Sequence, residues 1–152
     1  MTNNNILRRL RYALDFDDSK VISIFKKGDL HVTRAQTSDW LKKDDDESFV
    51  PCSDKTLAIF LNGLIIDRRG KKEGPQLEPE NKLTNNIVFR KLRIALNLQS
   101  EDIMEILASA NCSISKHELS AFFRKREHRH YRKCKDQVLR NFLQGLSLRF
   151  HS

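Results

Sequence analysis

Glycine, proline and cysteine are scarce in this chain, and it contains no long apolar run. Its 152 residues include five glycines and three prolines, which argues against a turn-rich β architecture and favours helices. No apolar segment approaches the ~18 residues needed to span a membrane. The start of the chain, MTNNNILRRLRYAL, lacks the apolar core and cleavage site of a signal peptide. We therefore expect no membrane span and a cytoplasmic protein.

One short sequence element occurs twice, 82 residues apart. It combines Cys-x-Asp with spaced leucine, phenylalanine and glycine residues, and residues 3–66 align with 85–148 at the same offset without a gap. The first copy is Cys52, Asp54, Leu57, Phe60, Leu61, Gly63 and Leu64, and the second is Cys134, Asp136, Leu139, Phe142, Leu143, Gly145 and Leu146. A fixed offset of this kind indicates an internal duplication.

Each repeat predicts four helices, because apolar residues recur at spacings of three and four. In the first repeat we expect them at about 4–14 and 18–27, then after a capping box formed by Thr33 and Gln36, and finally after Ser53. Gly28 is expected to end the second helix in a left-handed conformation. The sequence therefore predicts an all-α protein of two tandem four-helix repeats with approximate internal two-fold symmetry.

The predicted organisation is repeat one at 1–66, a charged connector at 67–84 that contains glycine and proline, and repeat two at 85–152. The connector should be exposed and partly extended. Repeat one has ten Lys/Arg and ten Asp/Glu, and the connector has five Lys/Arg and four Asp/Glu. Repeat two has thirteen Lys/Arg and six Asp/Glu, so it holds +7 of the net charge of +8. Such an asymmetry points to an anionic partner for the second repeat.

The loop between the third and fourth helices reverses its charge between the repeats. Residues 42–53 include Asp44, Asp45, Asp46 and Glu47, whereas residues 124–135 contain seven Lys/Arg, two His and one Tyr. Phosphates could bind the cations, and His130 and Tyr131 could stack on bases. The candidate nucleic-acid or anion site is Lys116, His117, Arg124, Lys125, Arg126, Arg129, His130, Tyr131, Arg132, Lys133 and Lys135. Arg68, Arg69, Lys71 and Lys72 of the connector could add to the same face.

Two other interpretations of this loop stay open. It could be a solvated charged loop, or it could pair with the acidic loop within the molecule or across a dimer. The second and third helices also resemble a helix-turn-helix, with Lys116, His117 and Ser120 facing outward in repeat two. Their linking turn is about two residues longer than the tight form, and Asp39 of repeat one is poorly placed against phosphate.

Catalytic and metal-binding patterns are weak. His117, His128, His130 and Cys134 could suggest zinc, but the surrounding positive charge would repel a cation and no Cys pair accompanies them. No nucleophile is paired with a base, and RRGKKEGP lacks the spacing of a phosphate-binding loop. We expect no enzyme activity, no cofactor and no metal. The matching cysteines of the repeats indicate small buried packing residues, and a disulfide is not expected in the cytoplasm.

Several strings resemble a known family. NNIVFRKLRIALNL (85–98), RGKKEGP (69–75), SKHELSAFFRK (115–125) and DQVLRNFLQGL (136–146) are similar to the YehS-like family of uncharacterised bacterial proteins with a duplicated domain of unknown function. The resemblance covers essentially the whole chain, and it implies no established activity and no catalytic residue.

The sequence thus favours a non-enzymatic binding protein whose basic second repeat binds RNA or DNA. The alternative is a protein interaction adaptor or homodimer in which the basic loop meets an acidic surface. A small-ligand sensor between the repeats is a third hypothesis.

Overall fold

The computed structural model describes residues 1–151, and this part of the chain forms eight helices and no strand. The helices are α1 (Asn3–Ala13), α2 (Asp18–Lys27), α3 (Arg34–Trp40), α4 (Asp54–Arg69), α5 (Asn85–Ala95), α6 (Ser100–Ser109), α7 (Lys116–Phe122) and α8 (Asp136–Phe150). Helices α1 to α4 correspond to α5 to α8 at the 82-residue offset. The predicted all-α class with two four-helix repeats is confirmed.

Local sequence determines where the helices begin. Thr33 and Gln36 exchange side-chain and main-chain hydrogen bonds at the start of α3, and Ser115 and Glu118 repeat this capping box in α7. Lys135 precedes α8 without a side-chain cap, whereas a serine caps the corresponding helix α4. The capping box predicted at Thr33 and Gln36 is therefore confirmed, as is the helix start predicted after Ser53.

The end of α2 differs from the prediction. Gly28 has φ −84°, and the left-handed residue is Asp29, with φ 68°. Aspartate and asparagine tolerate this conformation better than most residues, and Asn111 adopts it at the matching position with φ 61°. Helix α2 does end at Gly28, but the prediction that Gly28 is left-handed was wrong. Glycine is needed there for close packing, because a Cβ would collide with the carbonyl oxygen of Ile59 in α4.

Helix α4 extends to Arg69, three residues into the segment expected as connector. Asp67 in its last turn accepts from Lys20 and Lys27, whose Nζ atoms lie 2.8 Å and 2.6 Å from Oδ1. Gly70 then ends the helix with φ 83° and ψ 160°, a conformation open essentially to glycine alone. The non-helical connector therefore covers residues 70–84, and most of it is exposed.

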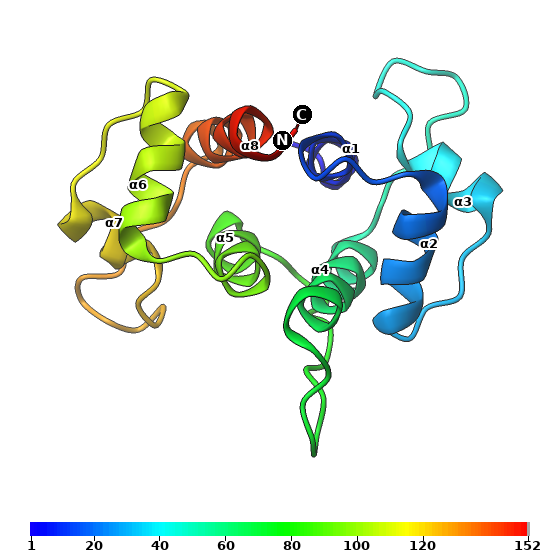
Figure 1. The fold of residues 1–152 in the computed structure, drawn as a ribbon, viewed down its shortest axis with the longest axis horizontal. Helices are drawn as coiled ribbons and strands as arrows, with labels where there is room; N and C mark the ends of the chain where they lie inside the picture. The colour runs from blue at the N-terminus through cyan, green and yellow to red at the C-terminus, as the bar shows by residue number, and fades with distance from the viewer. Residues whose placement is uncertain (152) are drawn as a thin grey trace.

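The two repeats are interleaved rather than placed side by side. Helix α1 packs along α8 and helix α5 along α4, so the first helix of each repeat lies mainly against the fourth helix of the other (Figure 1). The pairs α2–α3 and α6–α7 form the outer flanks, where α2 packs on α4 and α6 packs on α8 (Figure 1). This arrangement has the approximate two-fold symmetry that the duplication predicts.

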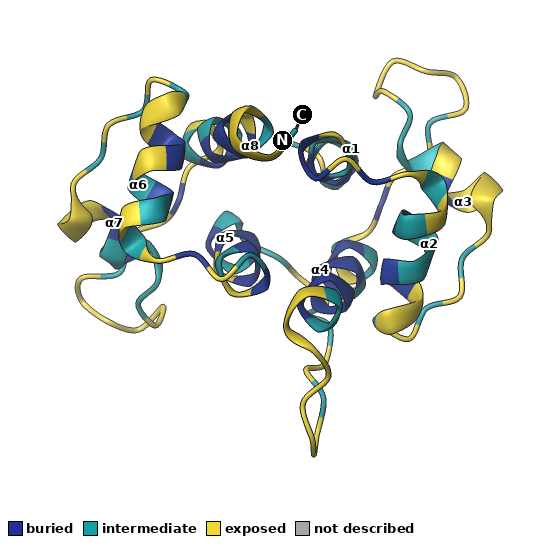
Figure 2. Cartoon of the chain, in the orientation of Figure 1, coloured by how far each residue is buried: buried dark blue, intermediate teal, exposed yellow. Residues whose placement is uncertain are grey.

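One hydrophobic core runs through both repeats, and its buried residues line the inner sides of the helices (Figure 2). Phe25, Phe60, Phe89 and Phe142 are fully buried in this core. Trp40, by contrast, is only partly buried against this core. None of the helices in residues 1–151 is long and apolar enough to cross a membrane.

The aspartate of the repeated element links the two repeats. Asp54 accepts from the Nδ2 of Asn3 in its own repeat (2.7 Å) and from the main-chain N–H of Leu83 just before α5 (2.8 Å). Asp136 accepts in the same way from Asn85 (2.7 Å) and from the main-chain nitrogen of Met1 (3.0 Å). Met1 and Leu83 are related by the 82-residue offset, so both links obey the internal symmetry.

Candidate nucleic-acid interface

Asn86 of α5 holds both ends of the basic loop, which we define as residues 124–135. Its Nδ2 donates to the carbonyl oxygens of Phe122 (3.1 Å) and Arg132 (2.8 Å), and its Oδ1 accepts from the N–H of Cys134 (2.9 Å). The Asn86 residue is 3% exposed, so this one buried side chain satisfies three main-chain groups. The loop therefore has a fixed base on the core.

The acidic loop of repeat one, residues 42–53, has the same backbone. Asn4 of α1 donates to the carbonyl oxygens of Trp40 (3.0 Å) and Val50 (2.8 Å) and accepts from the N–H of Cys52 (2.9 Å). Two main-chain turn hydrogen bonds also recur at matching positions of the two loops. The loops thus share one conformation and differ in charge, so the fold does not require the basic residues.

The cations of the basic loop have no acidic partner among residues 1–151: no ion pair of these residues includes any of the seven. Arg124 is half-buried and the other six are exposed. The seven are Arg124, Lys125, Arg126, Arg129, Arg132, Lys133 and Lys135. The only acidic side chain in the loop is Glu127, so the surface carries a strong positive potential that an anionic partner would neutralise.

Two imidazole rings of the loop, those of His128 and His130, are exposed. His130 is exposed, its ring centroid lies 5.5 Å from that of His128, and its Nε2 accepts from the Nε of Arg129 (3.2 Å). Tyr131 is half-buried, so less of its ring is available. The structure therefore favours His130 over Tyr131 as a surface for a base.

Helix α7 is a poor recognition helix. It has seven residues, and a turn of six residues separates it from α6, longer than the tight helix-turn-helix form. Lys116 at its start is paired with Glu101, Nζ to Oε1 3.0 Å, and Glu118 lies beside it. A main-chain hydrogen bond and then this lysine hold the pKa of the Glu101 carboxyl below its ordinary value. Acidic groups thus accompany Lys116 and His117, and the strongest positive charge lies in the loop.

The connector cations do not join the basic loop. The connector extends from the end of α4, while the basic loop lies beside α7, well apart in Figure 1. The Cζ of Arg68 lies 5.9 Å from the Phe16 ring centroid, and Arg69, Lys71 and Lys72 line a separate cavity. The two groups of cations therefore lie apart, and a contribution of the connector to the same binding face stays a prediction.

The acidic loop cannot neutralise the basic loop within one molecule. The two loops project at opposite ends of the molecule, next to α3 and next to α7 (Figure 1). Asp44 and its acidic neighbours form no ion pair with the basic loop in the described part of the chain. The alternative of intramolecular pairing is thus excluded, and only pairing between molecules stays open.

Two arginines of α5 extend the positive surface, and the sequence argument missed them. The Nη2 of Arg90 donates to the carbonyl oxygen of Phe123 (3.4 Å), and the Cζ of Arg93 lies 4.7 Å from the Phe123 ring centroid. Both have identical partners in repeat one, Arg8 and Arg11. The two arginines are identical in both repeats although they lie outside the apolar face of the helix, and this identity could have identified them from the sequence.

The cysteines behave as packing residues. Cys52 and Cys134 are buried and form no disulfide, as predicted. Burial raises the pKa of each thiol to about 12, so neither is a thiolate near neutral pH. His117, His128 and His130 are exposed whereas Cys134 is buried, and the described residues bring together no group of three potential metal ligands.

Comparison with known proteins identifies the family of the chain but assigns no function to it. The family model described as protein of unknown function (DUF1456) matches residues 3–70 and 85–151, which coincide closely with the two repeats. The chain is 44% identical over 152 residues to the uncharacterized protein YehS of Escherichia coli (strain K12), covering 99% of this chain and 97% of that relative. No solved structure matches the chain. The resemblance inferred from the sequence strings is confirmed.

Proposed function

The chain belongs to the DUF1456 family, and from that premise we propose that this member is a non-enzymatic protein whose basic loop binds nucleic acid. One observation carries the proposal. The acidic loop and the basic loop have the same conformation and are held by the equivalent residues Asn4 and Asn86. Only the basic loop presents seven cations, and these have no acidic partner among residues 1–151. A charge that the fold does not need points to a partner outside the molecule.

The form of the basic loop favours contacts with the nucleic-acid backbone over recognition of a base sequence. Arginine and lysine on a loop bind phosphate oxygens, and the exposed His130 ring offers a face for one base. Helix α7 is short and bears Glu118 at its start, so it supports no major-groove reading. A single strand of RNA or DNA, bound with little sequence preference, fits these features best.

Fluorescence anisotropy with single-stranded RNA, single-stranded DNA and duplex DNA tests the proposal. With about four phosphate contacts, the logarithm of the affinity should fall against the logarithm of salt concentration with a slope near −3 to −4. The variant Arg126→Glu/Lys133→Glu should lose most of the binding. Lys26→Glu/Lys43→Glu makes the same change in net charge at exposed residues elsewhere and should retain it. Absence of binding at about 50 mM salt, or equal losses in both variants, would contradict the proposal.

A second candidate is self-association through the oppositely charged loops. The loops lie at opposite ends of the molecule (Figure 1), so two antiparallel copies could pair each basic loop with the acidic loop of the other copy. Replacing Asp44, Asp45 and Asp46 by lysine should then abolish a dimer in sedimentation velocity at low salt. A monomer that is unchanged by this replacement would remove the adaptor alternative.

A further inference from the structure

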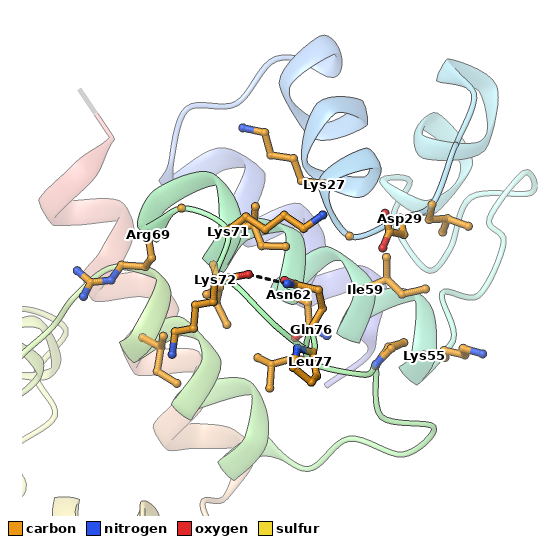
Figure 3. Close-up of a pocket in the computed structure, with 18 residues that line it drawn as sticks. Lys27, Asp29, Lys55, Ile59, Asn62, Arg69, Lys71, Lys72, Gln76 and Leu77 are labelled. Atoms are coloured by element: carbon orange, nitrogen blue, oxygen red, sulfur yellow. Dashed lines mark hydrogen bonds between the residues drawn. The ribbon is translucent and has the colours of Figure 1, made fainter.

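A cavity of about 810 Å³ lies where the connector meets α4 and the end of α2 (Figure 3). Its volume is in the range of small-molecule sites, and it lies at the junction of the two repeats, since Ile94 of α5 also lines it. We call it the connector cavity. It is distinct from the basic loop, none of whose residues line it.

The walls of the connector cavity are mainly apolar. Ile59, Ile65 and Ile66 of α4 line the cavity, and so does Leu77 of the connector. Ile59 and Leu77 are labelled in Figure 3. Leu77 is 64% exposed, a high value for a leucine in a chain that buries most of its large apolar side chains. An apolar ligand body would cover these groups.

The rim of the cavity is positively charged. Lys55, Arg69, Lys71 and Lys72 line it, and none of them forms an ion pair among the described residues. Lys27 also lines it, but its Nζ is bound to the Asp67 carboxylate, and Asp29 is the one acidic residue of the lining. Arg69 and Lys55 extend to opposite sides in Figure 3, so Lys71 and Lys72 of the connector are the cations that favour an anionic group over a neutral or cationic one.

The floor contributes a polar side chain, Asn62, which is 6% exposed. Its Oδ1 accepts from the Nζ of buried Lys91 at 2.5 Å, and Lys91 also lies 3.0 Å from the Oε1 of Glu80. The Nδ2 of Asn62 donates to no group within residues 1–151 and is available to a ligand acceptor.

The internal symmetry provides a comparison. The equivalent hollow between α1 and α8 has Gln144, Ser147 and Tyr12 where the connector cavity has Asn62, Ile65 and Ile94. There the Tyr12 ring is stacked on His151, with centroids 3.9 Å apart. Leu148 matches Ile66 and is also apolar, but Ile59 and Ile65 are replaced by Asn141 and Ser147, and no connector residue borders the second hollow in the described part of the chain.

We propose that the connector cavity binds a small organic anion with an apolar body, such as an aryl or acyl carboxylate, sulfonate or phosphate. The apolar part lies against the isoleucines of α4 and Leu77, and the anionic group meets the cations of the rim. The connector is suited to serve as one wall. The Nε2 of Gln76 donates to the carbonyl oxygens of Lys72 (2.7 Å) and Gly74 (3.0 Å), and these hydrogen bonds hold the connector in a defined turn.

Anilinonaphthalene sulfonate, an aromatic anion that fluoresces in apolar sites, tests the proposal on the full chain. It should bind at one saturable site, and its uncharged analogue N-phenylnaphthylamine should bind more weakly. The variants Lys71→Glu/Lys72→Glu and Leu77→Glu, at exposed connector residues that should not disturb folding, should each weaken sulfonate binding about tenfold. The charge variant should change binding of the uncharged analogue far less than binding of the sulfonate.

The variant Arg126→Glu/Lys133→Glu is the matched control, because it removes the same charge from the basic loop and should leave sulfonate binding unchanged. Circular dichroism confirms that each variant is folded. Three results would overturn the proposal: no saturable binding to the parent chain, unchanged binding in both connector variants, or an equal loss in the basic-loop variant. Nucleic-acid affinity is measured separately, so the outcome does not depend on the proposed function.

Discussion

A single buried amide, Asn86, decides the position of the basic loop. An asparagine side chain has two donor hydrogens and an acceptor oxygen, so it can serve two carbonyl groups and one N–H at once. Asn86 does this for Phe122, Arg132 and Cys134, and so joins α5, α7 and the loop end. The pair Asn3–Asn4 recurs as Asn85–Asn86, and the second asparagine of each pair binds the main chain at the ends of one loop.

Asn86→Ala should lower the free energy of unfolding by about 2–4 kcal/mol, because it leaves three buried main-chain groups without partners. It should also weaken nucleic-acid binding, since the loop loses its fixed base. Urea unfolding and fluorescence anisotropy measure the two effects. The matched control is Asn4→Ala, which removes the same three bonds from the acidic loop. It should cost similar stability and leave the affinity unchanged, and equal losses of affinity in both variants would contradict the prediction.

Asp67 makes stability depend on pH. Burial alone raises the pKa of its carboxyl, but the hydrogen bonds and charges of Lys20 and Lys27 prevail and hold that pKa below its ordinary value. The folded-state pKa is therefore lower than the unfolded value of about 3.9. The stabilisation is complete above that pH and is lost as the pH falls through the folded-state pKa.

Asp67→Asn should lower the free energy of unfolding by about 1–2 kcal/mol near neutral pH, because both lysines lose their charged acceptor. It should also make the remaining stability less sensitive to acid in that range of pH. Urea unfolding at a series of pH values between neutral and acid checks this. The control Asp29→Asn changes an exposed aspartate that forms no ion pair in the described chain, and it should behave like the parent.

At the scale of helices, the glycines of the repeated element set how closely α2 meets α4 and α6 meets α8. A Cβ at Gly63 would collide with the carbonyl oxygen of Ile24, and one at Gly145 with that of Ile106. The obstructing atoms belong to helix backbones, which cannot move aside as a side-chain end can. These two crossings hold the outer helix pairs to the centre of the molecule (Figure 1).

Gly145→Ala should lower the free energy of unfolding by about 2–3 kcal/mol, because α6 must shift away from α8. Gly63→Ala should act similarly on the other repeat. Gly74→Ala separates this effect from backbone strain: Gly74 has φ 84° and no atom near a built Cβ, so it should cost only about 1 kcal/mol. Thermal or urea unfolding compares the three. A cost at Gly145 no larger than that at Gly74 would show that the crossing can relax.

Sequence reasoning succeeded where structure is local. Apolar spacing identified the buried face of α1, and the pair Thr33 and Gln36 identified the start of α3. It failed at Gly28, where contact with Ile59 of another helix decides why glycine is needed. It located the basic loop but joined the connector cations to it, because sequence does not show that the two segments lie apart (Figure 1). The connector cavity depends on tertiary packing in the same way.

The whole molecule is held by packing between repeats. Since α1 lies on α8 and α5 on α4, and one core includes both repeats, neither repeat can bury its first helix without the other. The full chain should therefore unfold in one cooperative transition. A repeat produced alone should expose apolar surface that a second copy can cover, because the internal symmetry makes each repeat resemble its partner.

Residues 82–151, produced alone, should therefore form a symmetric dimer in which α5 of each copy packs on α8 of the other. This pairing is the counterpart of α5 on α4 in the full chain. Lys91 would meet the neutral amide of Gln144 in place of that of Asn62, but its ion-pair partner Glu80 lies outside the fragment, so the dimer should be less stable than the corresponding packing in the full chain. Sedimentation equilibrium should give twice the fragment mass, and adding residues 1–81 should convert the dimer to a one-to-one complex. A folded monomer of residues 82–151 would show that a repeat is stable alone and that the interleaved packing is not what holds the molecule together.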